Sequence, residues 1–177
     1  MLKSDRIYLR PIQDEDISEL APFFQNPDNV KYYIPTLWRT YNEQQVQGLL
    51  ADWHDQSHYY VYTICDGKDD AVIGLANLDG INYVNGNTEI GIAITDETRR
   101  GAGFAKEGLT LLINHCFDEL RLHRVFCRVM ADNEASLRLF EKLGFTQEGR
   151  QREQVRREGK FVDMLFFGLL EDEWIVE

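Results

Sequence analysis

Arg99-Arg100-Gly101-Ala102-Gly103-Phe104-Ala105-Lys106 joins a strand-like run to the longest amphipathic stretch of the sequence. Glycines in such a turn let the backbone point successive N–H groups outward, and the start of a helix adds free N–H groups and its dipole. The basic side chains Arg99, Arg100 and Lys106 surround the turn. The stretch therefore predicts a site for an anionic group such as a phosphate. The structural alternative is a plain strand-to-helix turn.

Two familiar phosphate motifs do not fit this stretch. A P-loop requires Gly-Lys-Ser/Thr, whereas Lys106 follows Ala105 and precedes Glu107. A dinucleotide-binding fingerprint requires Gly or Ala at the position of Lys106, and it normally opens the first crossover of its chain.

The flanking segments predict an α+β fold. Helices are expected over residues 14–25, 42–53, 104–120 and 134–143, and strands over 6–10, 59–65, 71–78, 87–95, 124–130, 145–150 and 161–170. Asn85-Gly86 is a hairpin signal, whereas the alternation of strands and helices after it indicates a crossover with a locally parallel strand pair. We expect a mixed, mostly antiparallel sheet with helices on its faces.

Composition favours an ordinary globular protein. With 19 basic and 30 acidic residues among 177, the formal charge is −11, which argues against nucleic acid and against an anionic membrane surface. No apolar stretch approaches the roughly 20 residues of a membrane span. Cys65, Cys116 and Cys127 lack metal-type spacing and are expected as free thiols in a reducing cytoplasm. Because no linker or repeat interrupts the sequence, residues 1–177 are expected to form one domain.

A second landmark supplies a family resemblance. It is Asp132-Asn133-Glu134-Ala135-Ser136-Leu137-Arg138-Leu139-Phe140-Glu141-Lys142-Leu143-Gly144-Phe145, with Asn133 placed as a helix N-cap and Gly144 as the C-cap. Together with Arg100-Gly101-Ala102-Gly103-Phe104-Ala105, which fits a pyrophosphate loop of the form Gln/Arg-x-x-Gly-x-Gly/Ala, it resembles the GNAT superfamily of acyl-CoA-dependent N-acyltransferases. The chain looks most like the branch that holds ribosomal-protein N-terminal acetyltransferases and spermidine acetyltransferases.

The resemblance implies acetyl-CoA as cosubstrate and no metal. Backbone N–H groups from Gly101 to Lys106 would hold its pyrophosphate beside Arg99 and Arg100. Ile92, Ala93 and Ile94 would pair with the pantetheine arm as though it were a strand, so the parallel strand pair would splay around the cofactor. Asn133 would contact the pantetheine or the thiol end.

The implied reaction is direct attack of a neutral amine on the thioester. A lysine-like amine has a pKa of about 10.4, so holding it neutral at pH 7 costs roughly 4.6 kcal/mol and calls for a proton acceptor. Glu89 is the candidate base, since related transferases often carry a glutamate in this place. Its alternative is a structural pair with an arginine such as Arg128. Phe140 stands where many relatives have a tyrosine that is thought to protonate the leaving thiolate. A phenyl ring cannot donate a proton, so either Ser136 or water donates it, or the thiolate leaves without a general acid. Ser136 is also a candidate capping residue.

The acceptor site is expected in the first half of the chain. Tyr33 and Trp38 are our candidates within an aromatic wall suited to cations, whose other members are Tyr32, Trp53, His54 and Tyr60. The acidic run Asp14-Glu15-Asp16 is a possible polyamine-facing surface, with plain solvent exposure as its alternative. Three functions stay open: acetylation of a polyamine or other small amine, acetylation of a protein N-terminus, and a catalytically silent CoA-binding regulatory module. Homodimers are common in the family, but no feature of the sequence decides the oligomeric state.

Overall fold

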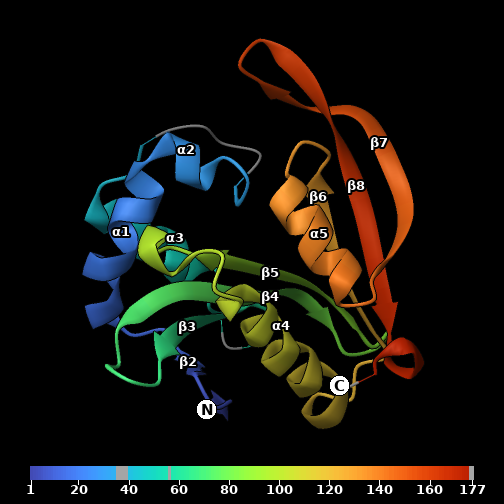
Figure 1. The fold of residues 1–177 in the computed structure, drawn as a ribbon, viewed down its shortest axis with the longest axis horizontal. Coiled ribbons are helices and arrows are strands. Elements are labelled where there is room, and N and C mark those ends of the chain that lie inside the picture. Colours follow the sequence, from blue (N-terminus) through green and yellow to red (C-terminus); the bar gives the residue numbers. More distant parts are fainter. Residues whose placement is uncertain (35–39, 56, 176–177) are drawn as a thin grey trace.

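An eight-stranded sheet in the order β1-β2-β3-β4-β5-β6-β8-β7 forms the frame of the molecule in a computed structural model (Figure 1). The structure describes residues 1–34, 40–55 and 57–175. The strands are β1 (Leu2–Lys3), β2 (Ile7–Pro11), β3 (Tyr60–Asp66), β4 (Val72–Asn82), β5 (Asn87–Ile94), β6 (Arg124–Met130), β7 (Thr146–Arg157) and β8 (Lys160–Leu170). Neighbouring strands are antiparallel except for the parallel pair β5 and β6, which confirms the predicted mixed sheet.

Helices cover both faces of this sheet. They are α1 (Ile17–Gln25), α2 (Pro27–Val30), α3 (Glu43–Asp52), α4 (Phe104–Asn114) and α5 (Glu134–Lys142), with short turns η1 (Asp14–Asp16), η2 (Glu97–Arg99), η3 (His115–Glu119) and η4 (Glu171–Glu173). Side chains alternate along β3, so Val61 belongs to the core cluster that includes residues of α1 and α3, whereas Ile64 belongs to the cluster that includes residues of α4. In the described part of the chain, no helix is long and apolar enough to cross a membrane.

The parallel pair parts soon after it forms. β5 and β6 are paired only from Asn87 opposite Arg124 to Glu89 opposite Phe126. β5 then continues to Ile94 and β6 to Met130, so the edge of β5 beyond Glu89 has no pairing with β6. A sheet that opens in this way leaves backbone groups and a gap available to a ligand.

Several elements differ from those expected. Directly after the helix expected over residues 14–25, a further four-residue helix, α2, begins at Pro27, because the Asn26 side chain accepts a hydrogen bond from Asp28 N and Pro27 suits a first helical position. The long helix leaves regular α-helical geometry after Asn114 and continues as the π-helical turn η3. β7 extends to Arg157 rather than ending at Arg150. Cys65, Cys116 and Cys127 are buried and free, as predicted.

The start of α1 is held by a buried ion pair. Arg10 Nη1 and Nη2 donate to the two carboxylate oxygens of Asp16 at 2.7 and 2.6 Å, and Thr63 Oγ1 donates to the same carboxylate at 2.8 Å. Because Asp16 is only 3% exposed, it does not form the polyamine-facing surface considered from the sequence. Its role is to join α1 to β2 and β3.

This ion pair predicts an acid-sensitive step in stability. Burial opposes the charge of Asp16, but the hydrogen bonds from Arg10, Gln13 and Thr63 prevail and lower its pKa below the usual value. A lowered folded-state pKa stabilises the protein above the unfolded-state value of about 3.9 and loses that contribution as pH falls. Asp16→Asn should therefore lower the free energy of unfolding by about 2 kcal/mol at pH 7 and much less near pH 2. Urea unfolding at both pH values measures this, and an equal loss at both would contradict it.

Candidate active site

The glycine turn has the backbone geometry expected of an anion site. Gly101 and Gly103 adopt φ of +77° and +88°, in the left-handed region that favours glycine. Gly103 is the N-cap of α4, and as a glycine it has no side chain with which to cap this helix start. A Cβ on Gly101 would meet no atom of the described residues within 4 Å, so among them the space over the turn is open. The first N–H groups of α4 therefore lack a side-chain cap.

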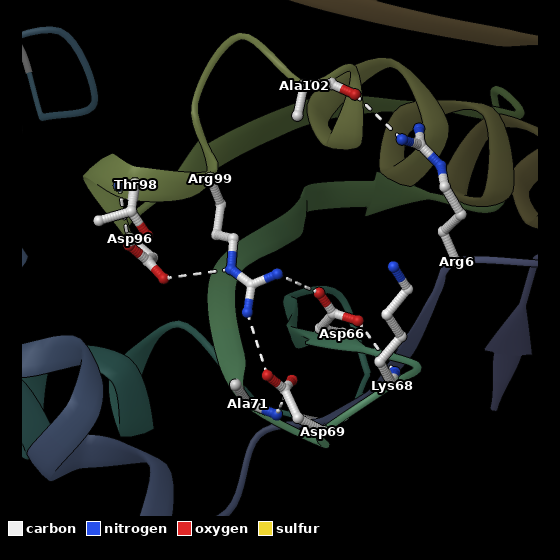
Figure 2. Close-up of polar contacts among 9 residues, drawn as sticks. All are labelled: Arg6, Asp66, Lys68, Asp69, Ala71, Asp96, Thr98, Arg99 and Ala102. Carbon is white, nitrogen blue, oxygen red and sulfur yellow. Dashed lines mark hydrogen bonds and ion pairs between the residues drawn. The ribbon is translucent and has the colours of Figure 1, made fainter.

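Arg99 anchors the turn rather than facing outward (Figure 2). Its Nη1 and Nη2 donate to Asp66 at 2.6 Å and Asp69 at 3.1 Å, and the Asp96 carboxylate lies 3.7 Å from its Nε. Carboxylates thus compensate its positive charge. On the other side of the turn, Arg6 Nη1 donates to the Ala102 carbonyl oxygen at 3.0 Å. The turn is held from both ends.

The other two basic residues lie closer to open space. Arg100 Nε donates to the Ile94 carbonyl oxygen at 3.0 Å, which ties the turn to the end of β5. Its Nη atoms reach Asn29 Oδ1 at 3.3 Å. Lys106 is exposed in the first turn of α4, and its ammonium forms no ion pair or hydrogen bond with any residue of the described ranges.

A cleft of about 650 Å³ lies against this turn. Its lining comes from α1, α2, β5, the turn, α4 and α5: Phe23, Asp28, Asn29, Tyr32, Tyr33, Ile92, Ala93, Ile94, Arg99, Arg100, Gly101, Gly103, Phe104, Ala105, Lys106, Asn133, Ala135, Ser136, Arg138, Leu139 and Lys142. Five of these residues are Arg or Lys and one is Asp, in a protein of charge −11. The cleft brings together every residue predicted to bind cofactor except Ala102, whose carbonyl faces Arg6. An open, uncapped helix start with a basic lining fits a pyrophosphate.

A second cavity of about 250 Å³ lies where β5 and β6 part. Its lining is Tyr32, Tyr33, Ile34, Trp53, Asn77, Asp79, Glu89, Ile90, Gly91, Ile92, Cys127, Arg128, Val129, Met130, Asn133, Ser136, Phe140 and Met164. Tyr32, Tyr33, Ile92, Asn133 and Ser136 line both spaces, so the two are adjacent. The predicted catalytic residues Glu89 and Ser136 and the predicted acceptor residue Tyr33 therefore meet at one place.

The aromatic wall is only partly as expected. Tyr32, Tyr33 and Trp53 line the second cavity, and the Tyr33 and Trp53 rings pack edge to face with centroids 5.9 Å apart. His54 and Tyr60 are not among the residues that line these two spaces. His54 Nδ1 accepts a hydrogen bond from Val61 N, and the His54 ring packs on Tyr60. Trp38 lies outside the described residues.

Glu89 forms the arginine pair that the sequence left open as its alternative role. Arg128 Nε and Nη2 donate to the two oxygens of Glu89 at 2.8 and 2.9 Å. Tyr33 donates its hydroxyl proton to Asn77 Oδ1 at 2.6 Å, and burial, with the charge of Asp79, raises the pKa of Tyr33 well above its usual value. The cavity thus holds carboxylates, a guanidinium and a neutral phenol.

The start of α5 forms another wall of both spaces. Asn133 is its N-cap, and the Asn133 side chain accepts a hydrogen bond from Ser136 N at 3.3 Å. Asn133, and not Ser136, is therefore the residue that caps this helix. Phe140 is buried and packs edge to face on Phe145, with ring centroids 5.1 Å apart. A phenyl ring at this position donates no proton.

Asp79 and Asn77 are site residues that sequence reasoning missed. In the sequence Asp79 reads as a turn residue beside Gly80, but β4 continues to Asn82 and places Asp79 opposite Glu89 and Asn77 opposite Gly91. A count of residues back along the strand from the hairpin turn at Asn85-Gly86 would predict that Asp79 lies near Glu89 on the neighbouring strand. A register shift between Asp79 and Asn82 makes such a count uncertain.

Several known proteins are similar to this chain in sequence and in fold. Residues 6–146 match the sequence profile of the family described as acetyltransferase (GNAT) domain. The spermidine N(1)-acetyltransferase of Escherichia coli is 25% identical over 182 residues, covering 100% of this chain and 92% of the relative. The ribosomal protein uS5-alanine N-acetyltransferase of the same organism is 25% identical over 181 residues, covering 98% and 92%. The crystal structure of spermidine N-acetyltransferase from Vibrio cholerae in complex with CoA and spermine has the same fold, with a TM-score of 0.87 at 22% identity over 96% of this chain and 98% of that chain.

Proposed function

The chain belongs to the GNAT acetyltransferases and is an acetyl-CoA-dependent N-acetyltransferase, and we propose that its acceptor is a polyamine or another small cationic amine. The observation that carries this proposal is the second cavity, which combines the acidic side chains Asp79 and Glu89 with the rings of Tyr33 and Trp53. Carboxylates and aromatic faces both attract ammonium groups. The spermidine acetyltransferases among the relatives support the same class of acceptor.

In this proposal the large cleft holds acetyl-CoA, which supplies an activated acetyl thioester when bound. We assign the pyrophosphate to the N–H groups from Gly101 to Lys106, with Arg100 and Lys106 adding charge. The pantetheine arm would follow Ile92, Ala93 and Ile94 along the edge of β5 that lacks pairing with β6. Asn133 and Ser136 would then lie near the thioester end, because both residues line the cleft and the second cavity.

A protein N-terminus is the second candidate acceptor, and the environment of Phe140 favours it. By the resemblance of the sequence, Phe140 in place of the usual tyrosine suits the ribosomal-protein branch, and Ser136 lines both spaces. In that case the Ser136 hydroxyl is the candidate donor to the departing thiolate. The relative that acetylates a ribosomal protein is as similar in sequence as the spermidine acetyltransferase.

Thiol release separates the two acceptor classes. The protein should release CoA thiol from acetyl-CoA with spermidine or spermine at least about tenfold faster, by kcat/KM, than with short peptides bearing free N-termini, because an acidic aromatic cavity favours multiple charges. A preference for peptides would contradict the small-amine proposal. No release with any amine, although acetyl-CoA stabilises the protein to heat, would indicate the catalytically silent CoA-binding module.

A further inference from the structure

Four residues on one face of the sheet define the acceptor end of the second cavity. β4 and β5 are paired so that Asp79 lies opposite Glu89 and Asn77 lies opposite Gly91. All four line the cavity. Since directly opposite side chains on one face of an antiparallel pair lie about 5 Å apart, the two carboxyl groups are close neighbours.

The two carboxyl groups have different surroundings. Both oxygens of Glu89 accept hydrogen bonds from Arg128, and the Glu89 side chain is only 19% exposed. A proton added to Glu89 would break this bidentate pair. Asp79 is half-buried and forms no ion pair with a basic side chain in residues 1–34, 40–55 and 57–175. Of the two, Asp79 is the one that can take up a proton without losing a strong partner.

We infer that Asp79 is the group that receives the proton of the acceptor ammonium, and that Arg128, through its bidentate pair with Glu89, holds the Glu89 carboxylate beside Asp79. This inference rests on the proposed transfer to an amine. It assigns the base to a residue on β4, whereas the sequence pointed to Glu89 on β5.

The charged and titratable groups around Asp79 support this role. They are Glu89 on β5, Arg128 on β6 and Tyr33 after α2. Burial raises the pKa of Asp79 and the charge of Glu89 raises it further, while a hydrogen bond from Asn77 and the charge of Arg128 offset part of this. A raised pKa brings the pKa of the carboxyl group closer to that of the ammonium group that it deprotonates. The buried Tyr33 phenol stays protonated and holds Asn77 through its hydroxyl.

The proton balance of the reaction is complete with Asp79 in this place. The ammonium gives one proton to the Asp79 carboxylate and becomes a neutral amine. The amine nitrogen forms a bond to the acetyl carbonyl carbon, the carbon–sulfur bond breaks, and the nitrogen's second proton passes to the departing sulfur. Asp79, being half-buried, returns its proton to water. The products are an N-acetylated amine, CoA thiol and one proton.

The test compares Asp79→Asn, Glu89→Gln and the wild type by thiol release. It uses the best amine of the acceptor panel and a fluorinated analogue of that amine with a lower pKa. Asp79→Asn should lower kcat/KM about 100-fold at pH 7, and the loss should shrink near pH 10 and with the fluorinated amine, because less of either amine is protonated there. Glu89→Gln should keep a pH-dependent rise in rate but move it to lower pH, since removal of the neighbouring negative charge lowers the pKa of Asp79.

Controls separate folding from chemistry. Asp118→Asn changes an exposed carboxylate on η3 and should leave kcat/KM within about twofold of the wild type. Asp79→Asn should bind acetyl-CoA as the wild type does, and Asp79→Glu should recover part of the rate. If Asp79→Asn loses equal activity at pH 7 and pH 10, or equal activity with both amines, the assignment to Asp79 is overturned while the proposed function stands. The assignment is likewise overturned if Glu89→Gln shows the same large loss at pH 7 that shrinks near pH 10. A wild-type protein that acetylates no amine overturns both.

Discussion

Gly103→Glu is expected to abolish the binding of acetyl-CoA. The substitution sets a carboxylate at the uncapped start of α4, where the pyrophosphate is proposed to bind, and it forces a side chain into φ of +88°. Its charge would occupy the helix N-terminus and repel phosphate. At a ligand concentration of about 100 times its Kd, acetyl-CoA should add about 2.7 kcal/mol to the free energy of unfolding of the wild type and none to that of the variant. Urea unfolding with and without acetyl-CoA measures the difference.

Gly103→Ala is the matched control for backbone strain. A Cβ at this position would lie 3.4 Å from Arg6 Nη2, an ordinary contact, so alanine adds strain without charge or bulk in the cleft. We expect it to lower stability by about 1 to 2 kcal/mol and to keep most of the stabilisation by acetyl-CoA. If Gly103→Glu were stabilised by acetyl-CoA as strongly as Gly103→Ala is, the pyrophosphate would not bind at this helix start.

Much of the second half of the fold could be predicted, because its periodicity and caps agree with one another. The strand expected over residues 124–130 is β6 as observed, and α5 begins after Asn133 as its capping pattern predicted. The positive φ of Gly101 and Gly103 agrees with the turn that the sequence predicted, because glycine needs no tertiary information to favour this conformation.

Tertiary contacts decide what the sequence pattern left open. Three basic side chains near a glycine turn predict a local positive charge, but the pattern did not reveal that Arg99 is turned toward Asp66 and Asp69, which come from the distant β3–β4 turn. Asp79 was missed for the same kind of reason, because its relation to Glu89 depends on strand register. The sequence predicted Glu89 as a site residue, and it offered the pairing with Arg128, which the structure shows as a bidentate ion pair, only as an alternative to the role of base.

The acidic charge of the whole chain and the basic cleft are consistent with each other. A net charge of −11 describes the average surface, whereas the lining of the large cleft has five basic residues and one acidic residue. The smaller cavity has Asp79 and Glu89 with Arg128 as its basic residue. A polyanionic cofactor and a cationic acceptor would therefore be attracted to two different but adjacent spaces.

Arg99→Met is expected to destabilise the protein and to release the start of the glycine turn. The Asp66 side chain is 3% exposed, and without Arg99 its carboxylate keeps, within the described residues, the hydrogen bond from Lys68 N to Oδ1 at 2.9 Å (Figure 2). Removing one member of a buried pair leaves an uncompensated charge, which costs about 4 kcal/mol. The turn would also lose its link to β3, so the KM for acetyl-CoA should rise about tenfold or more.

A double variant and a surface variant separate these effects. Asp66→Asn combined with Arg99→Met removes the buried charge as well, so it should recover part of the lost stability but not the KM, because the link between the turn and β3 is still missing. Asp69→Asn removes the partner whose side chain is 53% exposed and should cost less than about 1 kcal/mol. Urea unfolding and acetyl-CoA titration of thiol release measure both quantities. A loss of stability in Arg99→Met no larger than that in Asp69→Asn would mean that the Arg99–Asp66 pair does not hold the turn.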